Sequence, residues 1–244
     1  MVHILPVVGH QKGALIFWEK LLALGVQEDF KNPDYILVLG GDGTFLGAER
    51  DYYQLQKPFV GVGFGSINFL LNRAIQNPED LLARMQEENW IKFAMCGMDA
   101  VITTDEKIEK GIAFNDIYVK SMDPTGVVEL ELETKEYSAL ELKGDGMIIA
   151  TPQGSTAYNR NAGGTILPLS SMLWCLTGIC TAKPFHVTIE QQEILVKIKR
   201  NNAVVVTDNK IFYGARELRL VPSQFKAEAC FCQEEKFEKR RYNE

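Results

Sequence analysis

The sequence has little that would attach it to a membrane or to nucleic acid. The apolar stretch MLWCLTGIC (172–180) falls short of the roughly 18 residues of a membrane-spanning helix, so it predicts a buried core helix. The 32 acidic residues outnumber the 26 basic ones, which gives a formal net charge of −6. A chain without surplus positive charge has no field that gathers nucleic acid or anionic lipid. We therefore expect no membrane and no nucleic-acid partner.

Cysteine is also scarce, and its spacing does not predict a metal site. The chain has five cysteines, an odd number, and no CxxC pair. Cys230 and Cys232 are two residues apart, as neighbours on one face of a strand are. The first residues show no signal-peptide pattern. We expect reduced thiols, no metal ligand among the site residues, and a cytoplasmic protein.

What the sequence does contain is an alternation of strand and helix patterns in its first part. The run DYILVLG (34–40) is apolar almost throughout, as in a parallel strand buried on both faces. In NPEDLLARMQEE (77–88), Asn77 and Pro78 form a helix-start signature. The alternation predicts an α/β domain over residues 1–95, with a doubly wound, mostly parallel sheet.

A helix pattern also covers QKGALIFWEKLLALG (11–25). Its apolar residues Leu15, Trp18, Leu21 and Leu22 recur at helical spacing. We predict that these four side chains lie on one face of the helix, which ends at Gly25 as a plausible C-cap. The stretch HILPVV before it is typical of a strand, so the two patterns begin the strand and helix alternation of this domain.

From residue 96 onward the pattern changes to strands. VVELELET (127–134) alternates apolar and acidic residues, as a half-exposed antiparallel strand does. The stretches HVTIEQQEILVKIKR, NAVVVTD and ARELRLVPS are also typical of strands, and one helix could lie within 155–181. The second part therefore predicts a β-rich, mainly antiparallel domain over residues 96–244. The last segment of the chain can pack back on the first domain.

One short motif, LGGDGTFLG, places a carboxylate among glycines directly after a buried strand. Glycines let backbone amides approach an anion closely, and the start of a helix attracts phosphate. No Gly-Lys-Ser/Thr follows, so the motif is not a P-loop. A tight turn capped by the aspartate is the simpler alternative, but a cap does not need so many glycines. The motif predicts a phosphate site beside a carboxylate, formed by Gly40, Gly41, Asp42, Gly43 and Thr44.

Two later stretches have the composition of a nucleoside site. A second GDG occurs at 144–146, where Asp-Gly alone could be a hairpin turn. TPQGSTAYNRNAGG (151–164) follows, with hydroxyls and amides for polar edges and Tyr158 as an aromatic face. Its apolar flanks MIIA and TILPL argue against a flexible surface loop. In FNDIYV, Asn115 and Asp116 interrupt a strand pattern with side chains that can bind sugar hydroxyls.

The ordered set of GGDGT, Asn-Asp and GDGMIIATPQGSTAYNRNAGG resembles the NAD kinase family. The resemblance covers roughly residues 35–165, with weaker traces toward the C-terminus that include VVVTDN (204–209). It implies an α/β domain followed by a β-rich domain, and ATP-dependent phosphorylation of the adenosine 2′-hydroxyl of NAD to give NADP. It also implies Mg²⁺ (or Mn²⁺) with ATP, and a homodimer or homotetramer.

The resemblance further implies a role for each matched residue. Asp42 would be the general base, and the glycine loop with Thr44 would face the phosphates of ATP. Asn115 and Asp116 would hold the adenosine ribose, and Asp145 would contact the nicotinamide end from a neighbouring subunit. The NAD-binding residues that the resemblance implies are Phe45, Asn115, Asp116, Lys143, Asp145, Thr156, Ala157, Tyr158 and Asn161.

Three positions depart from the pattern of many relatives. Asp116 stands in place of glutamate, Lys143 in place of arginine, and Asn68 in place of glycine. Asparagine adopts left-handed backbone more readily than most residues, so we expect the turn at Asn68 to persist. Two alternatives share part of the motif set. One is a non-catalytic NAD- or nucleotide-binding sensor of the same fold, and the other is a diacylglycerol-type lipid kinase, which would not explain TPQGSTAY.

Overall fold

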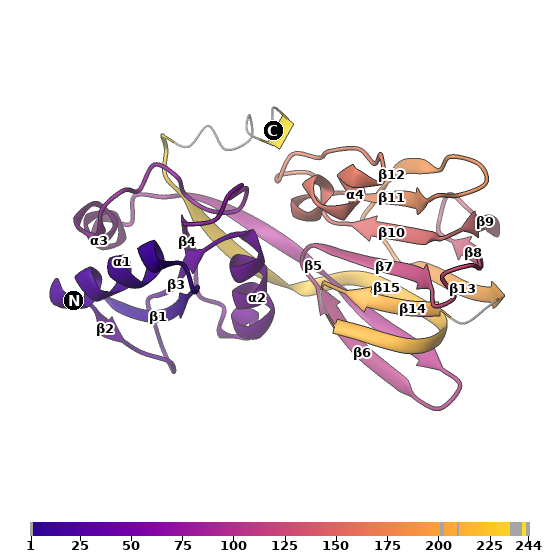
Figure 1. Ribbon diagram of the computed structural model, residues 1–244, viewed down its shortest axis with the longest axis horizontal. Helices are drawn as coiled ribbons and strands as arrows, with labels where there is room; N and C mark the ends of the chain where they lie inside the picture. The colour runs from indigo at the N-terminus through magenta and orange to yellow at the C-terminus, as the bar shows by residue number, and fades with distance from the viewer. Residues whose placement is uncertain (1, 201–202, 209, 235–240, 243–244) are drawn as a thin grey trace. The chain divides into compact units, whose positions relative to one another are not determined.

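Parallel and antiparallel strands separate into two parts of the chain. The computed structural model describes residues 2–200, 203–208, 210–234 and 241–242 (Figure 1). The first unit consists of residues 1–95 and 225–244, and the second unit of residues 96–224. The chain passes from one unit to the other within two long strands, β5 (Ile91–Thr104) and β15 (Lys210–Phe231).

The first unit is an α/β structure with a parallel sheet. The strand order is β2-β1-β3-β4-β15, and the pairs β1–β3, β3–β4 and β4–β15 are all parallel. Its helices are α1 (Lys12–Ala23), α2 (Asp42–Tyr52), the 3-10 helix η1 (Tyr53–Leu55) and α3 (Pro78–Glu87), and its other strands are β1 (His3–Val8), β2 (Gln27–Glu28), β3 (Tyr35–Gly40) and β4 (Phe59–Gly63). None of the described helices is long and apolar enough to cross a membrane.

Helices cover both faces of this sheet. Val60 of β4 belongs to the apolar cluster that includes Phe17 of α1 and Leu81 of α3. The neighbouring Phe59 makes a ring contact with Phe45 of α2, with centroids 6.0 Å apart. Successive strand residues point to opposite faces, so α1 and α3 lie on one face and α2 on the other. All six residues of β3 are buried, which fits their apolar run.

The apolar face predicted for α1 coincides only in part with the face that is buried. Leu15 and Leu22 are 48% and 42% exposed, whereas Ala14, Phe17 and Leu21 are buried. Apolar residues lie on more than one side of this helix, so helical spacing alone does not identify the buried face. The helix turns its bulky Phe17 inward, and Leu15 and Leu22 therefore fall on the outer side.

The predicted start of α3 is confirmed. The side chain of Asn77 accepts a hydrogen bond from the backbone N–H of Asp80 at 2.8 Å, and Pro78 occupies the first helical position. An asparagine cap satisfies one of the N–H groups that a helix start leaves unpaired.

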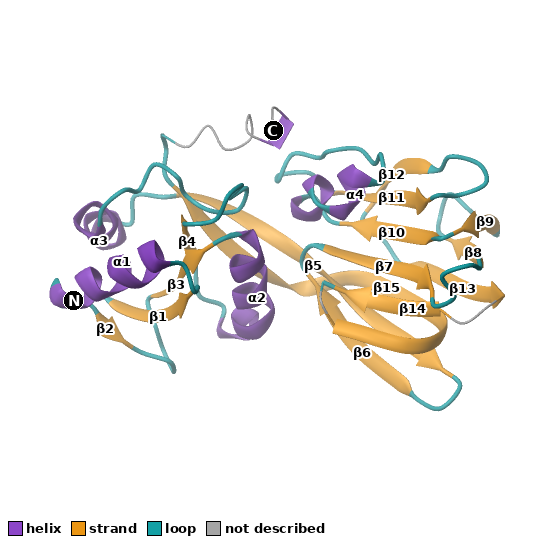
Figure 2. Ribbon diagram, in the orientation of Figure 1, coloured by secondary structure: helices purple, strands orange, loops and turns teal. Residues whose placement is uncertain are grey.

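The second unit is built of antiparallel strands (Figure 2). One row has the order β12-β11-β10-β7-β14-β15, and further pairs join β15 to β13, β13 to β8, β8 to β9 and β5 to β6. Its elements besides β5 and β15 are β6 (Ile108–Ala113), β7 (Asp116–Ser121), β8 (Val128–Glu133), β9 (Leu140–Gly144), β10 (Gly146–Ala150), the 3-10 helix η2 (Gln153–Thr156), α4 (Tyr158–Asn161), β11 (Leu173–Ile179), β12 (His186–Glu190), β13 (Ile194–Arg200) and β14 (Ala203–Thr207). The predicted fold class is confirmed.

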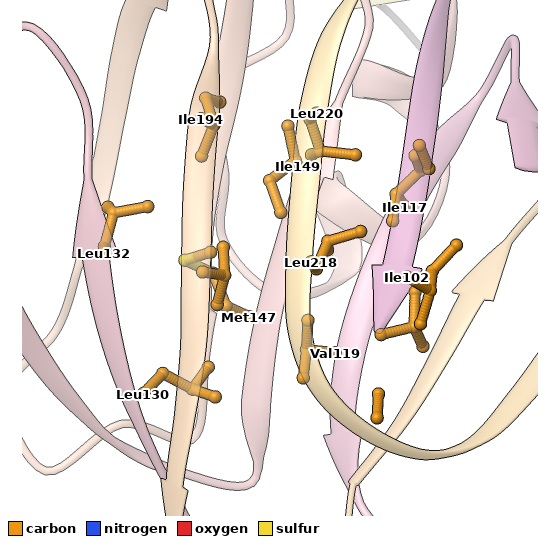
Figure 3. Close-up of a cluster of buried hydrophobic side chains, with 14 of the residues drawn as sticks. Ile102, Ile117, Val119, Leu130, Leu132, Met147, Ile149, Ile194, Leu218 and Leu220 are labelled. Carbon is orange, nitrogen blue, oxygen red and sulfur yellow. The ribbon is translucent and has the colours of Figure 1, made fainter. Parts of the chain in front are cut away.

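Alternating side chains from these strands form one apolar core (Figure 3). In β8, Val128, Leu130 and Leu132 are buried and the glutamates between them are partly exposed, as the alternation predicts. The outward Glu131 pairs with Lys197 and Lys199. On the side of β8 and β13 that faces away from the core, side chains of opposite charge therefore pair across the two strands.

The helix predicted for MLWCLTGIC (172–180) is wrong, because Leu173–Ile179 forms strand β11. The strand lies between β10 and β12 and pairs with both. A short apolar run cannot be assigned to helix or strand by periodicity, and here its neighbours in the sheet decide. The helix expected within 155–181 is the four-residue α4, which follows η2.

A buried asparagine joins distant segments of the first unit. Asn72 is fully buried, and its Nδ2 donates to the carbonyl oxygens of Gly61 (2.8 Å) and Cys230 (3.0 Å). Its Oδ1 accepts from the backbone N–H of Cys232 at 2.7 Å. Cys230 and Cys232 both belong to the apolar cluster of this unit, as expected for two side chains on one face.

We predict that Asn72→Ala lowers the free energy of unfolding by about 2–4 kcal/mol, because the buried N–H of Cys232 loses its acceptor and two carbonyls lose a donor. Urea titration measures this loss. Asn32→Ala, at an exposed position of the same unit, is the control and should change stability by less than about 0.5 kcal/mol. Equal effects of the two substitutions would contradict the role of Asn72.

Candidate functional site

The first part of the site is the junction between β3 and α2, where close packing requires glycine. A Cβ on Gly40 would lie 2.7 Å from Oγ1 of Thr44, and a Cβ on Gly65 would lie 2.9 Å from Cα of Gly41. Both distances are below ordinary contact. Gly41 is the N-cap of α2 and is extended, with φ −114°. Its carbonyl accepts the N–H groups of Thr44 and Phe45, at 2.9 and 3.1 Å.

Gly43 is the glycine of this motif with the most open space beside it. A Cβ there would meet no atom within 4 Å, and its φ is not in the left-handed region. Gly43 is exposed and lies in the first turn of α2. Thr44 and Phe45 donate to the carbonyl of Gly41, whereas the N–H groups of Asp42 and Gly43 precede any acceptor within the helix and can attract an anion. The space beside Gly43 is therefore open to a ligand with negative charge.

Asp42 has one oxygen fixed and one available. Its Oδ1 accepts the backbone N–H of Leu70 at 2.7 Å. Among the described residues, no group donates a hydrogen bond to Oδ2. The carboxylate is half-buried at the first position of α2, where the helix dipole favours negative charge. Asp42 is therefore oriented by the chain and still able to accept a proton or hydrogen bond from a ligand.

The turn that holds Leu70 uses Asn68 where many relatives have glycine. Asn68 is left-handed, with φ 58°, as predicted. Its Oδ1 accepts from the N–H of Gly65 at 2.9 Å, and its Nδ2 donates to the carbonyl of Gly65 at 2.8 Å. The side chain closes the loop that approaches Gly41. Asn68 thus supplies both the backbone conformation of a glycine and two hydrogen bonds of its own.

Of two other predicted residues of this part, Phe45 is buried and Thr44 is half-buried. Phe45 is 1% exposed, and its ring packs on Phe59 in the core, so any contact with a ligand would come from its backbone. Thr44 fills the space beside Gly40. Among the described residues, no group of three His, Cys, Asp or Glu side chains is arranged to hold a metal ion.

The second part of the site lies where β6 ends and β7 begins. Asn115 is half-buried and Asp116 is buried, and Nδ2 of Asn115 donates to Oδ2 of Asp116 at 3.2 Å. Asp208, which follows β14, accepts the backbone N–H groups of Phe114, Asn115 and Asp116 at 3.0, 2.9 and 3.2 Å. Sequence reasoning did not single out Asp208, although it lies in VVVTDN, whose last residue, Asn209, is outside the described residues.

Burial raises the pKa of Asp116 to about 7, and the negative charge of Asp208 adds to the shift. Tyr118 and Tyr158 lie close by, with their rings in an edge contact at 5.3 Å. The pKa of Tyr158 is raised by burial and by the charges of Cys180, Asp145 and Asp116. In the second unit, the charges of Asp116 and Asp145 therefore both act on the phenol of Tyr158.

The TPQGST stretch packs directly against Asn115. Oγ1 of Thr151 donates to the carbonyl oxygens of Phe114 (2.6 Å) and Asn115 (3.0 Å). Oγ1 also accepts the N–H of Gly154 at 3.2 Å. A Cβ on Gly154 would overlap the carbonyl oxygen of Asn115, so this position requires glycine. The loop is therefore held against Asn115 by hydrogen bonds and close packing, and it is not a flexible surface segment.

Asn159 closes the far end of this loop and was also missed in the sequence. It is fully buried, and its Nδ2 donates to the carbonyls of Ser155 (3.1 Å) and Thr165 (2.9 Å). Its Oδ1 accepts from Oγ1 of Thr177 at 2.7 Å. The predicted neighbours Thr156, Ala157 and Asn161 lie in η2 and α4 or between them, with Thr156 buried and Asn161 exposed.

Lys143 lies near the end of β9, and Asp145 is the single residue between β9 and β10. The backbone N–H of Asp145 donates to the carbonyl of Ile179, and its carbonyl accepts from Ser121. The ammonium of Lys143 pairs with Glu129 at 2.8 Å and lines a cavity of about 430 Å³. The side chain of Lys143 is therefore paired with Glu129, whereas the charge of Asp145 raises the pKa of Tyr158.

Comparison with known proteins gives matches over both units. The family model for the ATP-NAD kinase N-terminal domain matches residues 8–89, and that for the C-terminal domain matches residues 114–223. The chain is 36% identical to an NAD kinase of Rickettsia bellii over 68% of its own length and 64% of that protein. It is 33% identical to an NAD kinase of Rickettsia typhi, over 71% of its own length and 70% of that protein.

Two solved structures share the fold. An NAD kinase from Archaeoglobus fulgidus in complex with ATP superposes with a TM-score of 0.77 at 23% identity, covering 97% of this chain and 96% of that one. A yeast NADH kinase complexed with NADH gives a TM-score of 0.77 at 18% identity, covering 90% and 69%. At these identities the matches show the fold alone.

The buried carboxyl of Asp116 makes stability depend on pH. Its pKa is about 7 in the folded chain and near 3.8 when unperturbed, so between these values the folded state binds the additional proton. Stability is therefore lost as pH rises through this window. We predict that the melting temperature of the parent falls more steeply between pH 5 and 8 than that of Asp116→Asn, as measured by scanning calorimetry.

Asp123→Asn is the matched control for this experiment. Asp123 is exposed, and hydrogen bonds from Thr125 hold its pKa below the ordinary value, so it is ionised throughout the same window. Its substitution should leave the dependence of the melting temperature on pH the same as in the parent. Identical slopes for the parent and Asp116→Asn would contradict the raised pKa of Asp116.

Proposed function

Because the chain belongs to the NAD kinase family, we propose that it is an NAD kinase, which transfers the terminal phosphoryl group of ATP to the adenosine 2′-hydroxyl of NAD. The products are NADP and ADP. The observation that carries the proposal is Asp42, a carboxylate with one oxygen fixed by Leu70 and the other available at the open start of α2. Pure phosphate binding gains little from a carboxylate in this place.

The start of α2 supports a role in holding the donor phosphates. The N–H groups of its first turn attract negative charge, and the open space beside Gly43 lets a phosphate approach the backbone. Gly40, Gly41 and Thr44 hold the turn in this shape. Positioning and charge stabilisation account for most of the rate enhancement in phosphoryl transfer.

Asp42 acts in the proposed reaction as the general base. A bond forms between the 2′-oxygen of the ribose and the terminal phosphorus of ATP, while the bond from that phosphorus to the bridging oxygen of ADP breaks. The hydroxyl proton passes to Oδ2 of Asp42. A sugar hydroxyl is much less acidic than a carboxylic acid, so the proton moves late, as the new bond forms. Positioned general bases contribute roughly 10²–10⁴-fold.

A divalent ion, Mg²⁺ or Mn²⁺, would reach the site with the triphosphate of ATP. The phosphates of ATP would hold the ion, and the carboxylate of Asp42 at the same helix start would face its positive charge. When bound, the ion neutralises phosphate charge that would otherwise repel Asp42.

The second unit supplies the proposed binding site for NAD. Asn115 and Asp116 present an amide and a carboxyl that can bind the hydroxyls of the adenosine ribose, and Tyr158 offers an aromatic face. Further proposed contacts are Phe45, Lys143, Asp145, Thr156, Ala157 and Asn161. We also propose a homodimer or homotetramer in the cytoplasm; the five free cysteines fit a reducing compartment.

The first test is to incubate the purified protein with NAD, ATP and Mg²⁺ and to quantify NADP. We expect NADP from the parent chain, and a kcat lower by roughly 10²–10⁴-fold for Asp42→Asn. The asparagine oxygen can still accept the N–H of Leu70, so the fold is retained. Asp51→Asn, an exposed position on the same helix, is the matched control and should keep full activity.

Each other outcome has a definite meaning. A folded parent that binds NAD without forming NADP would indicate the non-catalytic sensor. A folded parent that neither binds nor phosphorylates NAD would contradict the substrate, and phosphorylation of diacylglycerol would then be assayed. Full activity of Asp42→Asn would remove Asp42 from the role of base.

A second prediction concerns the open space beside Gly43. Alanine fits there without contact to the chain, and it is a better helix former than glycine, so Gly43→Ala should fold at least as stably as the parent. Its methyl group would occupy the proposed phosphate position, and we expect KM for ATP to rise roughly tenfold or more. Steady-state kinetics at saturating NAD measure this.

Gly47→Ala is the matched control. Gly47 lies one turn further along α2, and its Cβ would approach only the Arg50 side chain, at 3.9 Å. The substitution gives a comparable gain in helix propensity without reaching the proposed phosphate position. An unchanged KM for ATP in Gly43→Ala would contradict phosphate binding at the start of α2.

A further inference from the structure

Asp208 lies beside the proposed NAD site without belonging to the residues that the motifs identify. It directly follows β14, which pairs with β7 so that Thr207 lies opposite Ile117. Its carboxylate accepts the N–H groups of three consecutive residues, with Oδ2 bound to Phe114 and Oδ1 to Asn115 and Asp116. Its own N–H donates to the carbonyl of Asp116 at 3.0 Å.

These hydrogen bonds determine the conformation of a short turn. Asn115 lies in the two-residue connection between Ala113, the end of β6, and Asp116, the start of β7. Phe114 and Asp116 are buried, so unpaired N–H groups there would be costly. Thr151 binds the carbonyl oxygens of the same turn from the TPQGST stretch. One side chain thus holds the N–H groups of the turn and another holds its carbonyls.

The charge of Asp208 also acts on Asp116. The two carboxyls lie close enough for Asp208 to raise the pKa of Asp116 in addition to the effect of burial. Among the described residues, the phenols of Tyr118 and Tyr158 also lie within the influence of the charge of Asp116. A change at Asp208 therefore alters the protonation of Asp116 as well as its position.

We propose that Asp208 is a positioning residue, which orients Asn115 and Asp116 toward the ribose of NAD by holding the three backbone N–H groups between β6 and β7. The inference rests on the proposed function for its substrate. It goes beyond that function by assigning NAD recognition to a residue that does not itself touch NAD. A residue that only capped the turn would stabilise the fold, and its loss would not change KM for NAD more than KM for ATP.

Asp208→Asn and Asp208→Gly test the proposal. Asp208 is left-handed, with φ 50°, and asparagine and glycine tolerate that conformation best. Asparagine keeps one acceptor oxygen and removes the charge, whereas glycine removes all three side-chain hydrogen bonds. We expect KM for NAD to rise roughly tenfold or more in both variants, with KM for ATP within about twofold of the parent.

The pH profile separates positioning from a purely structural role. In Asp208→Asn the pKa of Asp116 falls, because the neighbouring negative charge is gone. If ionised Asp116 accepts the ribose hydroxyls, KM for NAD in the parent decreases as pH rises from about 6 to 8. The same decrease should occur at lower pH in the variant. Asp123→Asn, another aspartate that accepts a backbone N–H, is the control and should match the parent.

Calorimetric titration measures NAD binding separately from NADP formation. It therefore distinguishes a failure of this inference from a failure of the proposed function. If the parent binds NAD but forms no NADP, the proposed function fails, and weaker NAD binding by the two variants still supports Asp208. If the parent does not bind NAD, both fail. NAD binding and KM within about twofold of the parent in the folded variants would overturn the role of Asp208. Failure of both variants to fold would overturn it as well, since Asp208 would then serve the whole unit.

Discussion

Backbone N–H and C=O groups at the ends of strands must find partners, and this requirement governs both parts of the site. Where β6 gives way to β7, Asp208 and Thr151 supply the partners from other elements, and the turn becomes rigid. Where β3 gives way to α2, the carbonyl of Gly41 is paired, but the first helical N–H groups lie beside the open space at Gly43. The same constraint thus rigidifies one turn and leaves the other receptive to an anion.

The sequence predicted the fold class, the family and most elements, because these depend on local patterns. The alternation in β8 and the Asn77 cap of α3 depend on nearby residues, and both are confirmed. Leu15 of the predicted apolar face of α1 is exposed, since apolar residues on several sides of a helix do not reveal which side is buried. Leu173–Ile179 was assigned to a helix, because only its neighbours in the sheet make it a strand.

The motifs single out candidate site residues but not the residues that support them. Asp42 and Asn115 stand out because they interrupt glycine-rich or strand patterns. Asp208 lies more than 90 positions from the N–H groups that it accepts, and Asn72 lies 158 positions from Cys230. No local pattern signals such a pairing. Asn68 is an intermediate case, because its tolerance of left-handed backbone was predictable but its hydrogen bonds with Gly65 were not.

The parallel sheet of the first unit is completed by a strand from the far end of the chain. Ala229 and Cys230 of β15 pair with Phe59 and Val60 of β4. During synthesis, the first 95 residues therefore leave the ribosome with Phe59 and Val60 of β4 unpaired on the side that β15 later covers. The second unit, which ends at residue 224, is fully made before that edge can be covered. The part of the chain that is made first is the last able to complete its fold.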